Sequence, residues 1–253
     1  MIHKWEVTLP KLTGEEKRMA YIYLPESYEK EPDRHYPVLY MFDGHNVFFD
    51  EDATYGKCWG MKEYMDYTDT QLIIAAVECN HGVNNERLSE YSPYNFTDPY
   101  FGKIKGKGKA TMDWFVEEFK PFIDGNFRTK PERESTFIAG SSMGGLMSLY
   151  AVMRYNKYFS RCAALSPSIS FSPERLEKLF KSARIRKDTH IYMDYGSKEI
   201  EEYPEVRDLY ADFTAQLMKR GIHVNSRIIP GGTHCEASWE RQLPFFMETL
   251  TYD

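Results

Sequence analysis

Residues 135–154 read STFIAGSSMGGLMSLYAVMR, and this stretch decides the fold. STFIA is an apolar run typical of a buried strand, whereas the residues after the glycines repeat apolar side chains at helical spacing. Between the two, Gly140, Ser142 and Gly144 fit the pattern G-x-S-x-G, which is typical of a nucleophile elbow. In such an elbow a sharp strand-to-helix turn exposes the serine oxygen above a sheet, and the glycines leave room for the turn. Ser142, rather than its neighbour Ser141, is therefore the candidate nucleophile.

The rest of the chain alternates short apolar runs with helical patterns. Buried strands are predicted at 37–42, 71–77, 135–139, 161–165, 190–195 and 224–229. Helices are predicted near 113–123, 144–156, 173–182, 205–220 and 239–250, the first of them shortened or bent by Pro121. The runs WEVTL and RMAYIYL at the start alternate like an antiparallel pair. The order predicts an α/β fold with a mostly parallel central sheet of about eight strands and helices on both faces.

Length and composition predict one domain over residues 1–253, because there is no internal repeat and no long linker. Residues 79–112 are rich in Gly, Asn, Pro and Tyr and are predicted to form a long flap loop beside the site. Lysines recur in its second half and could steer an anionic substrate, although a solvated charged loop is the simpler interpretation. They are Lys103, Lys105, Lys107 and Lys109.

Charge and hydropathy narrow the class of protein. A hydrophobic content of 42% supports a sizeable core, and a net charge of -6 argues against nucleic acid or an anionic membrane as the main partner. The sequence has no apolar run of transmembrane length and no signal-peptide pattern at its start, so we expect a cytoplasmic protein. The four cysteines lack CxxC or zinc-ligand spacing and are expected to be free thiols. They are Cys58, Cys79, Cys162 and Cys235.

A serine hydroxyl is a poor nucleophile at neutral pH and needs a base. His45, His81 and His234 follow predicted strands and so lie at the carboxyl edge of the sheet, where ligands bind in this fold class. The triad order in hydrolases with this elbow is serine, acid, histidine. Only His234 comes late enough to leave room for an acid before it, so it is the candidate base.

The acid should follow the strand at 190–195. Glu199 lies in the loop YGSKE, free to reach a histidine, whereas Asp194 lies inside the predicted strand. Glu201 and Glu202 also compete. We favour Glu199, with Asp194 as the second choice.

Negative charge that develops on a substrate oxygen needs preorganised donors. The N–H of Met143 is one expected donor, because Met143 follows the nucleophile at the start of a helix. The second donor is expected from Gly44 or His45 in the loop DGHN, where Asp43 could be a simple turn residue.

Several segments resemble one branch of the α/β-hydrolases. GSSMGGLMSLYA, LSPSISF, YGSKE and GGTHCEASW resemble the esterase branch that includes enterochelin-esterase-like, esterase D-like and feruloyl-esterase-like proteins. YPVLYMFDGHNVF resembles its oxyanion strand and loop, and ERLSEYSPY its R-x-x-E-Y-[ST]-P loop. The resemblance runs from about residue 18 to 250. It implies a serine esterase with the triad Ser142, Glu199 and His234.

The substrate is expected to be a small-molecule ester, such as an acyl sugar, a feruloyl ester or a catecholate ester. Trp59, Arg87, Tyr91 and Trp239 are candidates to line or brace the pocket, although Arg87 and Glu90 could equally form a structural ion pair. Acyl transfer through serine requires no metal or organic cofactor. Two alternatives remain open: an acyltransferase that uses the same acyl-enzyme, and a non-catalytic binding protein on the hydrolase fold.

Overall fold

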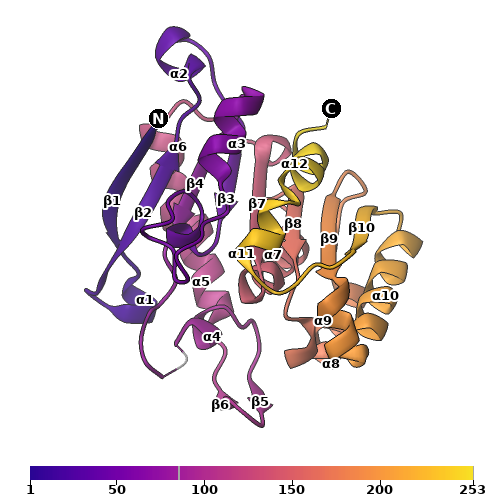
Figure 1. Cartoon of the computed structure of the whole chain (residues 1–253). Coiled ribbons are helices and arrows are strands. Elements are labelled where there is room, and N and C mark those ends of the chain that lie inside the picture. The colour runs from indigo at the N-terminus through magenta and orange to yellow at the C-terminus, as the bar shows by residue number, and fades with distance from the viewer. Residues whose placement is uncertain (85, 253) are drawn as a thin grey trace.

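The computed structural model describes residues 1–84 and 86–252, and an eight-stranded sheet forms its centre (Figure 1). Residues 85 and 253, which belong to the predicted segments 79–112 and 1–253, lie outside the described residues. The strands of the sheet are β1 (Ile2–Thr8), β2 (Lys17–Tyr23), β3 (Val38–Met41), β4 (Ile73–Val77), β7 (Thr136–Ser141), β8 (Arg161–Leu165), β9 (His190–Gly196) and β10 (His223–Ile229).

The pairing of the strands confirms the predicted fold class. The order across the sheet is β1-β2-β4-β3-β7-β8-β9-β10. β2 pairs antiparallel with both β1 and β4, whereas the pairings from β4 to β10 are parallel. The carboxyl ends of the six parallel strands therefore meet at one edge, where parallel sheets bind their ligands.

Helices cover both faces of the sheet (Figure 1). They are α1 (Pro10–Thr13), α2 (Ser27–Lys30), α3 (Met61–Thr68), α4 (Glu86–Glu90), α5 (Gly108–Trp114), α6 (Lys120–Asn126), α7 (Met143–Arg154), α8 (Pro173–Ser182), α9 (Ser197–Glu202), α10 (Pro204–Lys219), α11 (Glu236–Glu240) and α12 (Leu243–Thr251). Short 3₁₀ turns occupy Gly44–Asn46, Arg133–Ser135 and Ile169–Phe171. None of the helices within 1–84 and 86–252 has the length and apolar character that a bilayer crossing requires.

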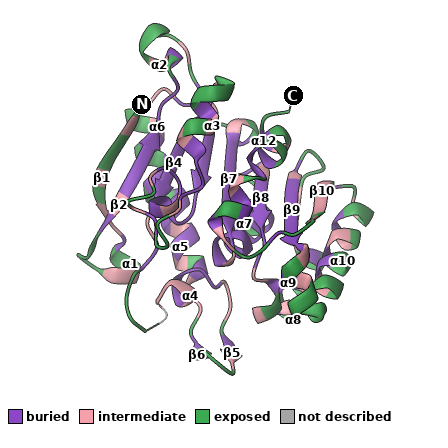
Figure 2. Cartoon of the chain, in the orientation of Figure 1, coloured by how far each residue is buried: buried purple, intermediate pink, exposed green. Residues whose placement is uncertain are grey.

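The central strands are buried on both faces (Figure 2). In β3, Val38 and Tyr40 point into the core shared with α5, α7 and α8, whereas Leu39 and Met41 point into the core shared with α3 and α12. Successive side chains of a strand alternate between faces, so a strand covered by helices on both sides is apolar throughout. This explains why the strands appear in the sequence as continuous apolar runs.

The predicted helix over 113–123 is three helical segments rather than one. α5 ends at Trp114, residues Phe115–Phe119 form a π-helical turn, and α6 begins at Lys120. Pro121 has no backbone N–H and lies in the first turn of α6. The wider turn lets the chain start a new helix where the proline would break the old one.

The segment 79–112 is partly regular instead of a continuous loop. It contains α4, the strands β5 (Phe96–Asp98) and β6 (Gly102–Ile104), and the start of α5. β5 and β6 form a hairpin that projects at the same end of the molecule as α4 and α9 (Figure 1). The ring of Phe96 stacks on Phe171 with centroids 4.6 Å apart, which anchors the hairpin to the body.

The four flap lysines differ in their surroundings. Lys107 lies 3.6 Å from a Glu86 carboxylate oxygen, and Lys109 lies 2.5 Å from Asp113. Lys103 and Lys105 are exposed on the hairpin side of this segment. Two of the lysines therefore have acidic neighbours, as expected for a solvated charged loop.

Candidate active site

Ser142 lies at the junction of β7 and α7 in a strained backbone conformation. Its φ is +57° and its ψ is -122°, a region that non-glycine residues rarely occupy. Its N–H donates to the Leu165 carbonyl at 2.9 Å, and its carbonyl accepts from the N–H of Ser168 at 3.0 Å. The side chain is half-buried, with its hydroxyl 3.4 Å from the Ser168 hydroxyl. The fold thus holds a reachable serine oxygen above the carboxyl edge of the sheet.

The elbow glycines allow two close backbone approaches. A Cβ on Gly140 would lie 2.7 Å from the Gly144 carbonyl carbon. A Cβ on Gly144 would lie 3.0 Å from Phe42 Cβ and 3.2 Å from the Asp43 carboxylate. A Cβ therefore does not fit at Gly140, and at Gly144 it would require Phe42 or Asp43 to shift. The second approach sets the first turn of α7 against the loop that follows β3.

Glu199 and His234 are joined directly. The Glu199 Oε2 lies 2.6 Å from His234 Nδ1, and its Oε1 accepts from the Gly196 N–H at 2.8 Å and the Ser166 hydroxyl at 2.7 Å. Burial raises the pKa of Glu199, but the hydrogen bonds, that of His234 foremost, outweigh it and leave the pKa lowered. The carboxylate is buried, whereas 47% of the His234 side chain is exposed. An ionised acid therefore orients an imidazole whose other nitrogen is free to face a substrate.

Glu199 lies in the first turn of helix α9 and not in the predicted loop, and the junction of β9 with α9 touches the His234 loop through glycine. A Cβ on Gly196 would lie 2.2 Å from the Gly232 carbonyl oxygen, so Gly196→Ala should push the junction and the loop apart. We expect a loss of about 1–3 kcal/mol in the free energy of unfolding, and a fall in turnover. Urea unfolding measures the first effect. Gly125→Ala is the matched control, since a Cβ there meets nothing within 4 Å and a helical alanine is stabilising.

Asp194, the second choice for the acid, has other partners. It lies in β9, where it accepts from the Tyr192 hydroxyl at 2.8 Å and from the Ser166 N–H at 3.2 Å. Burial raises its pKa to about 7. Asp194 therefore supports the loop that contacts Glu199, whereas the contact with His234 belongs to Glu199.

The raised pKa of Asp194 predicts a pH dependence of stability. Between about pH 4 and pH 7 this carboxyl is ionised in the unfolded chain but protonated in the folded one, so the free energy of unfolding falls as pH rises. Asp194→Asn removes this contribution. Relative to the variant, the wild type should lose up to about 1.4 kcal/mol per pH unit in that window. Urea unfolding at several pH values measures the free energy of unfolding of both proteins. A difference between wild type and variant that stays constant with pH would contradict the prediction.

The candidate oxyanion donors lie at two helix starts. Met143 is the first residue of α7, and Gly44 and His45 open the 3₁₀ turn Gly44–Asn46. The first N–H groups of a helix have no partner inside that helix and are available to an anion. The geometry is compatible with the prediction that Met143 and Gly44 or His45 supply these donors.

Asp43 holds the second helix start in place and is more than a simple turn residue. Its backbone is left-handed, with a φ of +55°. Its carboxylate accepts two hydrogen bonds from Arg87, each 2.7 Å long, and its N–H donates to the Tyr91 hydroxyl at 3.3 Å. The ion pair with Arg87 outweighs the effect of burial and keeps the pKa of Asp43 lowered. These contacts fix the loop that contains the candidate donors.

Arg87 and Glu90 do not pair with each other, contrary to one of the two interpretations of the sequence. Arg87 pairs with Asp43, whereas Glu90 pairs with Arg18 at 2.6 Å in a buried ion pair. Tyr91 is fully buried between these pairs, so it braces the loop instead of lining a cavity.

Trp59 and Trp239 also brace the site. Both are nearly fully buried, with ring centroids 6.0 Å apart. Trp239 donates from its indole N–H to the Ser166 hydroxyl at 3.1 Å, and its ring meets that of His234 edge-on at 5.1 Å. Trp239 thus contacts the His234 ring directly, and Trp59 packs against Trp239.

The three loops converge at one edge of the sheet. Gly144 sets the elbow against Asp43, as described above. Glu236 is buried and lies two residues after His234 in the sequence. Its pKa is raised, chiefly by burial, and the charges of Asp43, His234 and Arg87 also affect this pKa. The His234 loop and the loop after β3 therefore lie within electrostatic range of each other.

Ser166 and Ser168 are functional candidates that the sequence reasoning missed. Ser166 bonds to Glu199 and Trp239 and has a positive φ of +43°, and Ser168 contacts the Ser142 hydroxyl. Both serines directly follow β8, the strand next to the elbow, and this position at the carboxyl edge of the sheet is the signal that indicates them.

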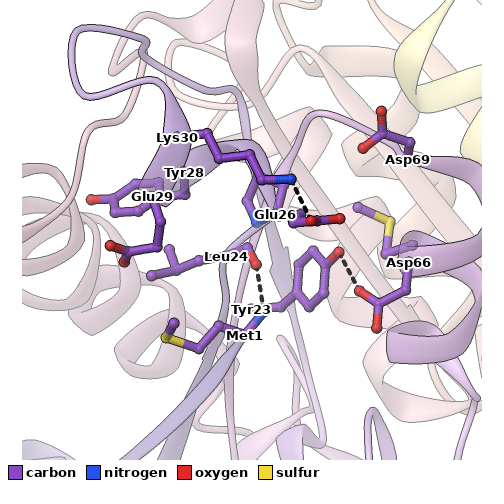
Figure 3. Close-up of a pocket in the computed structure, with 11 residues that line it drawn as sticks. Met1, Tyr23, Leu24, Glu26, Tyr28, Glu29, Lys30, Asp66 and Asp69 are labelled. Carbon is purple, nitrogen blue, oxygen red and sulfur yellow. Dashed lines mark hydrogen bonds and ion pairs between the residues drawn. The ribbon is translucent and has the colours of Figure 1, made fainter.

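A cavity of about 470 Å³ lies elsewhere, near the N-terminus (Figure 3). It is lined by residues of β2, α2 and α3, including Tyr23, Glu26 and Asp66. Tyr23 ends a strand that runs antiparallel to β4, so the cavity lies at the edge opposite Ser142. Among the described residues, its lining includes neither a serine nor a histidine, so the cavity does not suit the predicted serine–histidine chemistry.

Comparison with known proteins identifies the family. The model of the family described as "Putative esterase" matches residues 13–248, almost the whole chain. The chain belongs to this esterase family. The resemblance found in the sequence is thereby confirmed, and membership supports a carboxylic ester hydrolase.

Individual proteins and solved structures are also similar to the chain. The chain is 25% identical over 193 residues to "Uncharacterized protein YbbA" of Bacillus subtilis, covering 74% of this chain and 70% of that protein. It is 26% identical over 238 residues to an endo-1,4-beta-xylanase/feruloyl esterase of Xylanibacter ruminicola, covering 91% of this chain but 29% of that larger protein. An IroE-like serine hydrolase from Shewanella oneidensis shares the fold, with a TM-score of 0.74, 22% identity and coverage of 99% and 78%.

Proposed function

We propose that this chain is a serine esterase that hydrolyses carboxylic esters of small molecules through an acyl-enzyme. The observation that supports it most is the 2.6 Å contact of Glu199 with His234 at the same sheet edge as a serine held at a φ of +57°. A buried carboxylate that holds a half-exposed imidazole is what a general base for a serine requires.

In the proposed mechanism His234 takes the proton from Ser142 as the hydroxyl oxygen attacks the ester carbonyl. Glu199 orients the imidazole and stabilises its positive form. The N–H groups of Met143 and of Gly44 or His45 hold the oxyanion. His234 then gives the proton to the leaving alcohol, and water attacks the acyl-enzyme with His234 again acting as base.

The Ser142 hydroxyl lies 3.4 Å from the Ser168 hydroxyl, and in the proposed mechanism it bonds to His234 once substrate is bound. Catalytic hydrogen bonds often tighten only in the substrate complex. Ser168 therefore supports the resting position of the nucleophile.

The proposed substrates are small-molecule esters: acyl sugars, feruloyl esters and catecholate esters. One relative is named a feruloyl esterase, which supports feruloyl esters as the first group to assay.

The test is hydrolysis of this ester panel by purified wild type and Ser142→Ala. We expect the wild type to hydrolyse at least one of the three groups of esters and Ser142→Ala to lose this activity. Product analysis in the presence of a sugar acceptor separates the alternatives: free acid supports a hydrolase, acyl sugar an acyltransferase. If the protein binds an ester but neither hydrolyses it nor is labelled by a fluorophosphonate, a non-catalytic binding protein is supported instead.

A further inference from the structure

Three metal-ligating side chains gather beside the candidate oxyanion loop, outside the proposed triad. His45 follows β3, and Cys79 and His81 follow the neighbouring parallel strand β4. One ligand atom from each lies within 4.8 Å of the other two. The two imidazole rings meet edge-on, with centroids 4.6 Å apart. The carboxyl ends of two adjacent strands thus bring together residues that are dispersed in the sequence.

The ring of His45 has one nitrogen that lacks a partner. Only 3% of this residue is exposed, and within residues 1–84 and 86–252 its Nδ1 has no hydrogen-bond partner. Its Nε2 lies 3.0 Å from the Thr54 hydroxyl. A proton on Nε2 donated to Thr54 leaves a lone pair on Nδ1, and metal-binding histidines are commonly oriented by such a bond. A buried lone pair without a donor is costly, and a cation would satisfy it.

We propose that His45 Nδ1, Cys79 Sγ and one ring nitrogen of His81 bind a single Zn²⁺ or a similar divalent transition ion. Imidazole and thiolate are the ligands that Zn²⁺ prefers. Three protein ligands leave one tetrahedral position for water. On binding, the Cys79 thiol loses its proton to solvent and a sulfur–metal bond forms.

The surrounding charges are compatible with a cation. Asp43 and Glu78 are negative neighbours of His45, whereas Arg87 is positive and already paired with Asp43. His81 is exposed and gives the ion a path from solvent.

Occupancy would be coupled to the candidate active site. His45 also belongs to the 3₁₀ turn whose N–H groups are candidate oxyanion donors. A metal ion at its side chain would fix this turn relative to β4. The proposal nevertheless rests on the cluster itself and does not depend on the esterase mechanism.

The test is a Co²⁺ titration of the full chain, freed of metal with a chelator and with its thiols kept reduced. We expect one equivalent to produce visible d–d bands and a near-ultraviolet thiolate-to-cobalt band, which Zn²⁺ then removes by competition. Cys79→Ser should abolish the thiolate band. His81→Ala and Thr54→Val should weaken Co²⁺ binding roughly tenfold or more.

Cys235→Ser is the matched control, because Cys235 is the more exposed thiol and lies next to another histidine. This variant should keep the thiolate band. Circular dichroism checks that each variant is folded. His81→Ala leaves the core intact, because His81 is exposed. Absence of the band in the wild type, its survival in Cys79→Ser, or its loss in Cys235→Ser would overturn the proposal.

Discussion

Replacement of Ser142 or His234 by alanine is expected to lower ester turnover by roughly 10⁶. The first change removes the atom that attacks the carbonyl, and the second removes the base that activates it. Because the two act as one unit, the double variant should be no slower than either single variant. Steady-state and single-turnover assays on the best ester of the panel measure the effect.

Ser141→Ala is the matched control for this experiment. Ser141 is the last residue of β7 and is buried, so its hydroxyl lies outside the proposed chemistry. We expect turnover within about tenfold of the wild type, since only a small buried hydroxyl is lost. A fall of less than tenfold in Ser142→Ala, with the protein folded by circular dichroism, would exclude Ser142 as the nucleophile.

Glu199→Gln is expected to lower turnover by roughly 10⁴. Glutamine keeps the shape of the side chain but cannot stabilise the positive imidazole that forms when His234 takes a proton. It also presents an uncharged group to the donors from Gly196 and Ser166. The effect should appear in the chemical step, which single-turnover kinetics isolates.

Asp194→Asn is the natural comparison, because both acids hydrogen-bond to Ser166 but only Glu199 contacts His234. We expect this change to lower turnover by less than about tenfold, because Asp194 does not contact the groups that react. The opposite ranking, with Asp194→Asn the more damaging change, would transfer the role of acid to Asp194.

The elbow could be predicted because its signal is local, and the Glu199–His234 pair could be predicted because both residues follow strands in the order that such an elbow implies. The strained turn at Ser142 favours glycine on both sides, and this preference is visible as a motif. The order of serine, acid and histidine follows from the order of parallel strands. The sequence predicts Glu199 in a loop, whereas the structure places it in the first turn of α9, directly after β9, where it reaches His234.

The ion pairs that support the site could not be predicted in this way. Asp43 and Arg87 are 44 residues apart, and Arg18 and Glu90 are 72 residues apart. Their pairing depends on how the segment 79–112 folds back over β2 and β3. Nothing in the local pattern distinguishes such an arginine from one that binds substrate.

The cluster of His45, Cys79 and His81 illustrates the same limit. Spacing along the sequence argued against a zinc site, because zinc motifs are recognised as short repeats of Cys and His. Adjacent parallel strands instead bring the loops after β3 and β4 together across more than 30 intervening residues. Only the strand order of the sheet reveals this arrangement.

The most direct test of the central claim is mass-spectrometric mapping of a fluorophosphonate adduct. We predict one adduct per chain, on the peptide that contains Ser142, absent in Ser142→Ala and formed far more slowly in His234→Ala. An adduct on Ser141, Ser166 or Ser168, or labelling that persists in Ser142→Ala, would contradict the proposed mechanism.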